Sequence, residues 1–266
     1  MESKYSDLIM DWLKEEQYTH CFFVGGGNIM HLLESARTRF ECIPVLHEVA
    51  AAIGVEYFNE ISEGHKRAFA LVTAGPGITN AITGIAGAWL DSRELLVIGG
   101  QAKVENLSRN KGVRQTGHQE IDGVRLTSGI TKESILIDTP ISKNKFVSIC
   151  NKSKNPRKGP VFIEICLDVS GQLVDQQDLE SKNKEEIEEY NYPRITEETD
   201  KQIINLITSS KRPTLLIGAG VSKEMVQKNI DKLKKINIPI TLTWNGSDRL
   251  EFDHLLNMGR PNTYGM

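Results

Sequence analysis

The chain has 266 residues and a mass of 29.7 kDa, a length typical of one large domain or two of ordinary size. Its composition, 39% hydrophobic, 25% charged and 6% aromatic, excludes a disordered, collagen-like or coiled-coil chain. The 32 Lys and Arg residues nearly balance the 35 Asp and Glu residues, and a net charge of -3 supplies no field that would gather nucleic acid or an anionic membrane. We therefore expect no nucleic acid and no membrane as partners.

Targeting and redox signals point to the cytoplasm. The acidic, amphipathic N-terminal segment lacks the features of a signal peptide, and no segment has the roughly 20 apolar residues that cross a bilayer. The four cysteines, Cys21, Cys42, Cys150 and Cys166, sit singly in apolar runs without C-x-x-C spacing. This pattern favours buried thiols in a reducing cytosol over disulfides or zinc ligands.

The first half of the sequence alternates helix and strand patterns. Apolar spacing predicts a helix over Tyr5–Glu16, and a compact apolar run predicts a strand over His20–Val24. The glycine loop Gly25–Gly27 follows, and Asn28 is expected to cap the next helix. The further predicted elements are a helix over Ile29–Arg37, a strand over Ile43–Leu46, a helix over Glu48–Asn59, a strand over Phe69–Thr73, a helix over Ile78–Leu90 and a strand over Glu94–Ile98. This alternation predicts a doubly wound α/β fold, with a parallel sheet covered by helices on both faces.

The second half predicts a boundary between two domains. The polar stretch Ala102–Thr116 is long enough for a functional loop, and Pro160–Ile165 reads as another buried strand. Residues 171–195 are polar and charged, as in a surface linker. A second α/β pattern then has an amphipathic helix with Ile203, Ile204 and Ile207, a strand over Pro213–Ile217, the turn Gly218–Gly220, a helix to about Lys235 and a strand over Pro239–Thr243. We expect a complete domain over 1–170, a linker over 171–195, and a truncated, incomplete second α/β domain over 196–266.

Three glycine loops follow predicted strands. The dinucleotide fingerprint G-x-G-x-x-G fails in each, because the third position is Met30, Asn80 or Lys223, and there is no Walker G-K-[ST]. A structural turn explains any single loop. Three loops at the carboxyl ends of parallel strands are harder to dismiss, because α/β proteins bind ligands at that edge.

Glu48 is the most informative single residue. It follows a predicted strand and begins a helix whose small residues, Ala50–Ala52 and Gly54, allow another group to pack closely. A carboxylate at a helix N-terminus ordinarily does no more than interact favourably with the helix dipole, worth about 0.3 to 1 kcal/mol. Taken alone, Glu48 is explained best by that structural role, and the neighbouring His47 by packing or capping.

A series of short motifs occurs in order along the first 168 residues. They are Val24–Gly27, Leu46–Glu48, Val72–Asn80, Ala88–Ser92, Gly99–Gln101, His118–Asp122, Ile130–Lys132 and Gly159–Val161. Together they resemble the pyrimidine-binding domain of thiamine-diphosphate-dependent enzymes of the acetolactate synthase group. Arg212–Gly220 and Ile238–Thr241 similarly resemble the start of the central domain of that family.

The resemblance implies roles for particular residues. It makes Glu48 the catalytic carboxylate that hydrogen-bonds a ring nitrogen of the aminopyrimidine, promoting the imino tautomer and the reactive ylid that decarboxylates 2-keto acids. Gln119 is implied as a second catalytic residue, with His118 and Lys132 near the substrate, although a solvated surface position explains Lys132 equally well. The implied cofactor-binding residues are Gly25, Gly26, Glu48, Gly75, Pro76, Gly77, Thr79 and Asn80.

Departures from the family pattern leave the acceptor substrate open. Gly25 replaces the proline of the usual V-P-G-G, Leu46 replaces the arginine of R-H-E, and His118 replaces the aromatic residue that often precedes the glutamine. Acetyl transfer to a sugar or a related acceptor is as plausible as acetolactate synthesis.

The largest departure is the lack of a G-D-G motif, through which the family holds the diphosphate and Mg²⁺ in a separate domain. The resemblance therefore implies that thiamine diphosphate binds here through its pyrimidine end only, with Mg²⁺ held by a missing or partner domain; FAD in the central domain stays open. We expect a carboligase or decarboxylase portion that is inactive alone, acts on a small 2-keto acid such as pyruvate, and pairs as a homodimer or with a partner subunit. Truncation is favoured over a split enzyme because the sequence stops inside a domain. A non-catalytic dimerisation or binding module is the further alternative.

Overall fold

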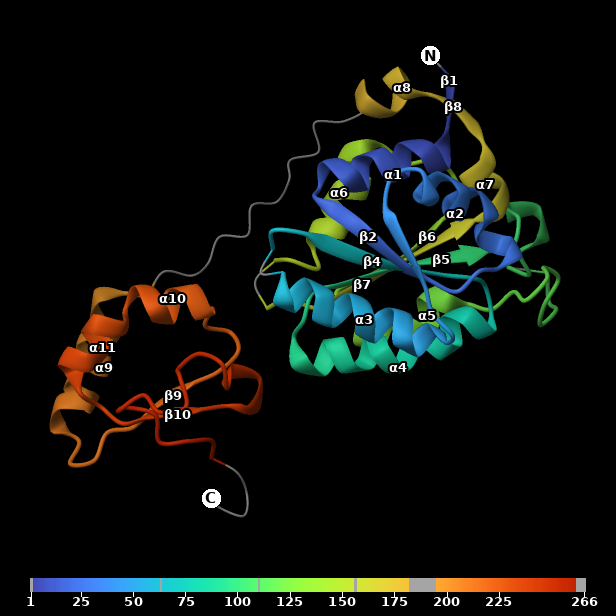
Figure 1. Ribbon diagram of the computed structural model, residues 1–266. Helices are drawn as coiled ribbons and strands as arrows, with labels where there is room; N and C mark the ends of the chain where they lie inside the picture. Colours follow the sequence, from blue (N-terminus) through green and yellow to red (C-terminus); the bar gives the residue numbers. More distant parts are fainter. Residues whose placement is uncertain (1, 63, 110, 156, 182–194, 262–266) are drawn as a thin grey trace. The chain divides into compact units, whose positions relative to one another are not determined.

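The computed structural model describes residues 2–62, 64–109, 111–155, 157–181 and 195–261. It contains two compact units, Met1–Tyr190 and Asn191–Met266, each described here by itself (Figure 1). The N-terminal unit extends beyond the predicted end at residue 170. Residues that we assigned to the linker form β8 (Leu173–Asp175) and α8 (Gln176–Ser181), and 182–194 lie outside the described residues.

The N-terminal unit is built on a six-stranded sheet with the order β3-β2-β4-β5-β7-β6 (Figure 1). Every neighbouring pair in this sheet is parallel. The strands are β2 (Tyr18–Phe23), β3 (Glu41–Pro44), β4 (Arg67–Val72), β5 (Leu95–Gln101), β6 (Glu133–Ile137) and β7 (Pro160–Cys166). Because all six run in the same direction, their carboxyl ends form one edge of the sheet and their amino ends form the other.

Helices cover both faces of the sheet, which confirms the predicted doubly wound α/β fold (Figure 1). On one face are α1 (Tyr5–Glu15), α2 (Met30–Arg37), α6 (Lys143–Asn151) and α7 (Leu167–Gly171); on the other are α3 (Glu48–Ile61), α4 (Pro76–Asp91) and α5 (Gly123–Thr127). Each face of the sheet carries its own apolar core, and β4 contributes side chains to both. Phe69 and Leu71 belong to one core, and Ala68, Ala70 and Val72 belong to the other.

Some local predictions were wrong. Asn28 does not cap a helix: it lies in a 3-10 turn over Gly27–Ile29, and Ile29 precedes α2 without a side-chain cap. The half-buried edge strand β6 was missed, as was the short antiparallel pair of β1 (Glu2–Lys4) with β8. These strands lack the continuous apolar run that marks a strand buried on both faces.

The cysteines are free thiols, and Cys21, Cys150 and Cys166 are buried while Cys42 is half-buried. They are not all isolated, however, because Cys21 lies directly opposite Cys42 in the β2–β3 register. A hydrogen bond with Cys42, together with burial, raises the pKa of the Cys21 thiol well above its usual value. The sequence could not show this pairing, since it depends on the strand register.

The C-terminal unit contains a two-stranded parallel sheet and helices. Its small core consists of Ile217, Val226, Ile240, Leu242, Leu250 and Leu256. The elements are α9 (Glu197–Ser209), β9 (Leu215–Ile217), α10 (Lys223–Lys228), α11 (Ile230–Ile236), β10 (Ile240–Leu242) and a 3-10 turn over Trp244–Gly246. The single helix predicted to about Lys235 is divided at Asn229 into α10 and α11. Across the described parts of both units, no helix is both long and apolar enough to cross a membrane.

Candidate functional site

Most of the predicted site residues lie at the carboxyl edge of the six-stranded sheet. Strand β2 ends before the turn Gly25–Gly27, β3 leads to the N-terminus of α3, and β4 leads through Gly75 to α4. The three strands are neighbours in the sheet, so these connections meet at one place (Figure 1). This is the edge at which open α/β sheets bind ligands.

Glu48 is the first residue of α3, and only 7% of its surface is exposed. Its Oε2 accepts a hydrogen bond of 2.9 Å from Nδ2 of Asn80 on α4. His47 is the N-cap of α3, and its Nδ1 accepts from the backbone N–H of Val49 at 3.3 Å, so the imidazole caps this helix. The positive end of the helix dipole favours an anion at Glu48.

Close packing surrounds the Glu48 carboxylate. A Cβ atom added at Gly77 would lie 3.0 Å from Cγ2 of Thr73 and 3.5 Å from Oε1 of Glu48. A Cβ atom at Gly26 would lie only 2.4 Å from Cβ and Oγ1 of Thr73, whereas one at Gly25 would meet nothing within 4 Å. Gly26, Thr73, Gly77 and Glu48 therefore lie side by side, in a space where any larger residue would intrude.

Thr73 was not predicted as a site residue. Its Oγ1 is buried and has no hydrogen-bond partner among the described residues. Leaving a buried hydroxyl unpaired costs about 1 to 3 kcal/mol, so such groups gather where function needs them. The available sequence signal was its place in the motif Val72–Asn80, directly before the glycine turn.

The loop carrying Gln119 meets the Gly75 turn. Gly75 has φ +63°, and a Cβ atom added there would lie 2.6 Å from the carbonyl oxygen of Gln119. Gln119 itself has φ 56°, a left-handed conformation that costs a residue with a side chain about 1 to 2 kcal/mol. His118 and Gln119 are both exposed. The structure thus brings Gln119 against the glycine turn, with His118 next to it in the chain.

Pro76 and Thr79 lie in the first turn of α4. Both are exposed, and Oγ1 of Thr79 donates to the carbonyl of Pro76 at 3.2 Å. They join the predicted cofactor-binding residues at this edge, although in the described part of the chain their side chains form no hydrogen bond with Glu48.

Lys132 is not brought to this site. It directly precedes β6, and its backbone N–H donates to the carbonyl of Pro160, the first residue of β7, so it lies at the amino edge of the sheet. Its Nζ donates to the carbonyl of Asn155 at 3.1 Å. Burial, and then the nearby Lys152, lower the pKa of this ammonium group. Glu48 follows the carboxyl end of β3, so Lys132 and Glu48 lie at opposite edges of the sheet within this chain. The substrate role of Lys132 stays a prediction.

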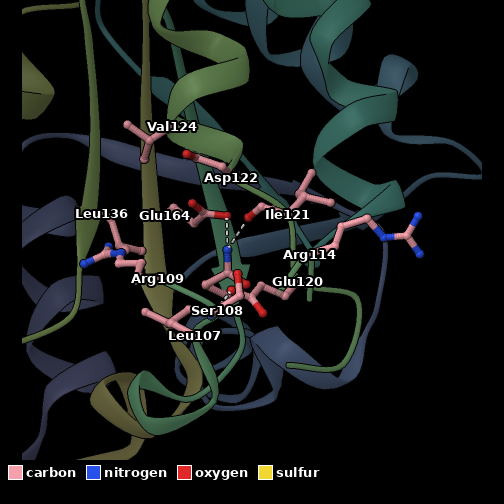
Figure 2. Close-up of a pocket in the computed structure, with 11 residues that line it drawn as sticks. Leu107, Ser108, Arg109, Arg114, Glu120, Ile121, Asp122, Val124, Leu136 and Glu164 are labelled. Atoms are coloured by element: carbon pink, nitrogen blue, oxygen red, sulfur yellow. Dashed lines mark hydrogen bonds between the residues drawn. The ribbon is translucent and has the colours of Figure 1, made fainter. Parts of the chain in front are cut away.

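A second polar region lies at the carboxyl ends of β5, β7 and β6. It encloses a cavity of about 370 Å³ whose lining includes Gln101, Asp122 and Glu164 (Figure 2). Nε2 of Gln101 donates to the carbonyl of Ile121 at 2.7 Å and to Oε1 of Glu164 at 2.8 Å. Figure 2 shows Glu164 and Ile121 on either side of the donor that joins them. These residues were quoted in motifs or strands but were not predicted as site residues.

The pKa values of two glutamates that line this cavity are shifted in opposite directions. Burial, with the added charge of Asp122, raises the pKa of Glu164 to about 8, against the opposing effects of Arg109 and hydrogen bonds. Burial acts in the same sense on Glu120, but backbone N–H groups of Ser108, Thr116 and Gly117 outweigh it and lower the pKa to about 2. The Glu120 carboxylate therefore binds backbone N–H groups of the polar stretch Ala102–Thr116. The raised pKa of Glu164 favours its protonated form at neutral pH.

No cluster of three or more His, Cys, Asp or Glu side chains in the described parts of the chain could hold a metal ion. The candidate site is therefore defined by a carboxylate, an amide and glycine turns. These groups suit a ligand that offers a flat face to the turns and a nitrogen to the carboxylate.

Comparison with known proteins identifies the family that the N-terminal unit resembles. Residues 3–126 match the family described as "Thiamine pyrophosphate enzyme, N-terminal TPP binding domain". The N-terminal unit is an N-terminal TPP-binding domain of the thiamine pyrophosphate enzymes, as the motif series indicated.

The similar proteins define a narrower group. The acetolactate synthase of Arthrospira platensis is 29% identical over 265 residues, which cover 97% of this chain and 44% of that protein. The acetolactate synthase large subunit of Lactococcus lactis subsp. lactis (strain IL1403) is 30% identical over 271 residues, covering 98% and 44%. The domain is therefore acetolactate synthase-like. This chain spans less than half the length of these relatives.

Proposed function

We propose that this chain supplies the aminopyrimidine-activating portion of a thiamine-diphosphate-dependent 2-keto acid decarboxylase or carboligase. The observation that carries the proposal is the Glu48 carboxylate, nearly buried at a helix N-terminus, held by Asn80 and placed beside the glycine turns. Small 2-keto acids such as pyruvate are the proposed substrates, in a cytoplasmic setting. The similarity to acetolactate synthases supports carboligation as the reaction.

The residues fit the pyrimidine end of the cofactor. The backbone at Gly26 and Gly77 packs so closely against Thr73 that an added Cβ atom would lie 2.4 Å and 3.0 Å from its side chain, and Oγ1 of Thr73 has no hydrogen-bond partner in the described parts of the chain. The Glu48 carboxylate has no ion-pair partner in the described parts of the chain, so it is available to a ring nitrogen. A cationic neighbour would compete for that carboxylate.

Glu48 would do the proton chemistry in this proposal. Its carboxyl group would share a proton with the ring nitrogen and thereby favour the imino form of the pyrimidine, while the bound cofactor supplies the electron sink for decarboxylation. Gly75, Pro76 and Gly77 would wall the ring. Gln119, held against Gly75, and the neighbouring His118 would face the substrate side.

Pairing of two chains is part of the proposal. The outer face of α3 exposes Ile53, Tyr57 and Ile61 at helical spacing, and α4 exposes Trp89 and Leu90. Exposed apolar groups gathered on adjacent helices are typical of protein–protein interfaces. We propose that a second copy or a partner subunit covers them and that a diphosphate-binding domain, with its Mg²⁺, completes the site next to Glu48.

Calorimetry tests whether thiamine diphosphate binding needs both this chain and a separate diphosphate-binding domain. Because the 266 residues contain no G-D-G motif, the purified chain should bind thiamine diphosphate with Mg²⁺ no more tightly than millimolar and should not consume pyruvate. Adding a diphosphate-binding partner should give micromolar, Mg²⁺-dependent binding. Micromolar binding and pyruvate consumption by the chain alone would contradict the proposal, since no partner would then be needed.

A further inference from the structure

Among the described residues, the Glu48 carboxylate accepts a hydrogen bond at one of its two oxygens. Oε2 accepts from Nδ2 of Asn80 at 2.9 Å, whereas Oε1 lies beside Gly77, 3.5 Å from where a Cβ atom would stand. A hydrogen bond to an ionised carboxylate is strong and directional. The two oxygens therefore have different surroundings, because Oε2 is held by the Asn80 amide and Oε1 lies next to Gly77, which has no side chain.

The distance between helices α3 and α4 determines whether Asn80 can reach Glu48. Both helices follow parallel strands of one sheet and pack against each other on the same face. One turn after Glu48 on α3 is Ala52, and one turn after Asn80 on α4 is Gly84. A Cβ atom added at Gly84 would lie only 2.5 Å from Cβ of Ala52, so the helices touch there with no room for a methyl group.

We propose that Asn80 is a positioning residue, which holds Oε2 of Glu48 so that Oε1 meets the ring nitrogen, and that the Ala52–Gly84 contact keeps the two helices close enough for it to do so. The role toward the ring nitrogen rests on the proposed function. The geometry that Asn80 imposes on Glu48 does not, because it exists without any cofactor. Asn80 thus acts through Glu48, and its effect is to choose the oxygen that carries the exchangeable proton.

Carbon-13 NMR of the side-chain carboxyl carbons, recorded against pH on this chain without cofactor, measures the effect directly, with Glu48→Gln assigning the Glu48 signal. Losing a hydrogen-bond donor destabilises the ionised form, so Asn80→Ala should move the Glu48 titration curve to higher pH. Asn80→Asp keeps the shape but removes the donor and adds a like charge, so its shift should be larger. Gly84→Ala should move the curve in the same direction by separating the helices.

Thr83→Ala is the matched control, because Thr83 is exposed on the same helix, and its curve should coincide with that of the unchanged chain. Far-ultraviolet circular dichroism identifies the folded variants, and if Asn80→Ala does not fold, Asn80→Asp and Gly84→Ala decide the question. Curves at the original position in the folded variants would overturn the proposal. Failure of a cofactor-type pyrimidine to bind would instead contradict the proposed function and leave the titration result standing.

Discussion

A buried glutamate lies in each half of the carboxyl edge of the sheet, and the two glutamates have different surroundings. In the half formed by β3, β2 and β4, Glu48 stands at a helix N-terminus beside glycine turns and accepts one amide hydrogen bond. In the half formed by β5, β7 and β6, Glu164 lies within a strand, is 1% exposed, and has its pKa raised to about 8 by burial and by Asp122. Figure 2 shows Glu164 and Asp122 together in the lining of the cavity.

The difference shows why burial alone does not mark the reactive group. Burial raises the pKa of Glu164 to about 8, yet its Oε1 already accepts a hydrogen bond from Nε2 of Gln101. Glu48 combines a helix dipole, a neutral donor at Oε2 and a glycine without a side chain, Gly77, next to Oε1. We infer that the first half of the edge does chemistry and that the second half holds the polar loop and a proton.

The largest effect is expected from Glu48→Gln. In an assembled enzyme loaded with thiamine diphosphate, this change should slow exchange of the thiazolium C2 proton by about 10² to 10⁴-fold, because the amide cannot exchange a proton with the ring nitrogen. Hydrogen–deuterium exchange followed by proton NMR measures the rate. Glu164→Gln should leave it close to that of the unchanged enzyme, and equal losses in both variants would erase the distinction between the two halves.

Glu164 should dominate the pH dependence of stability. Its pKa is raised in the folded state, so the folded chain binds more protons than the unfolded chain between about pH 4.5 and pH 8, and stability falls as pH rises through that window. The loss should amount to a few kcal/mol at most. Urea unfolding at pH 5 and pH 8 measures it, and Glu164→Gln should flatten the dependence. An equally steep dependence in that variant would assign the effect to another group.

The glycine turn should tolerate substitution unevenly. Gly26→Ala would place a Cβ atom 2.4 Å from Thr73 and should lower stability by about 1 to 3 kcal/mol. Gly27→Ala is the control, because a Cβ atom there would meet nothing within 4 Å. Chemical denaturation compares the two variants, and losses of equal size would show that the close approach at Thr73 is not the cause.

The smallest effect is expected at the opposite edge. Lys132→Met removes one hydrogen bond to the carbonyl of Asn155 and should lower stability by about 1 kcal/mol or less. Because Lys132 lies at the amino edge, the KM for a 2-keto acid in an assembled enzyme should not change. A several-fold rise in KM at unaltered stability would restore the substrate role implied by the resemblance.

The parallel sheet was predictable from the sequence because its central strands are continuous apolar runs. The run Pro160–Ile165 matches β7 apart from its last residue, and the helix predicted over Glu48–Asn59 matches α3 apart from its last two residues. The glycine turns and Glu48 followed from motif order. The edge strand β6 was not predictable in the same way, because it is only half-buried and lacks a long continuous apolar run.

The site was predictable only in part, because local sequence does not reveal contacts between elements. The bond between Asn80 and Glu48, the unpartnered hydroxyl of Thr73 and the raised pKa of Glu164 all depend on how strands and helices pack. For Lys132, motif order and the position in the fold point in different directions. Motif order suggested a role for it, but the direction of β6 places it at the far edge of the sheet.

The central claim is that Glu48 meets an aminopyrimidine, and titration of this chain with 4-amino-2-methylpyrimidine tests it most directly. Carbon-13 NMR of the glutamate carboxyl carbons reports on every Glu at once. The account predicts a saturable, millimolar shift of the Glu48 signal, no comparable shift of the Glu164 signal, and loss of binding in Glu48→Gln. A Glu48 signal that stays unchanged at saturating pyrimidine, or binding that persists in Glu48→Gln, would contradict it.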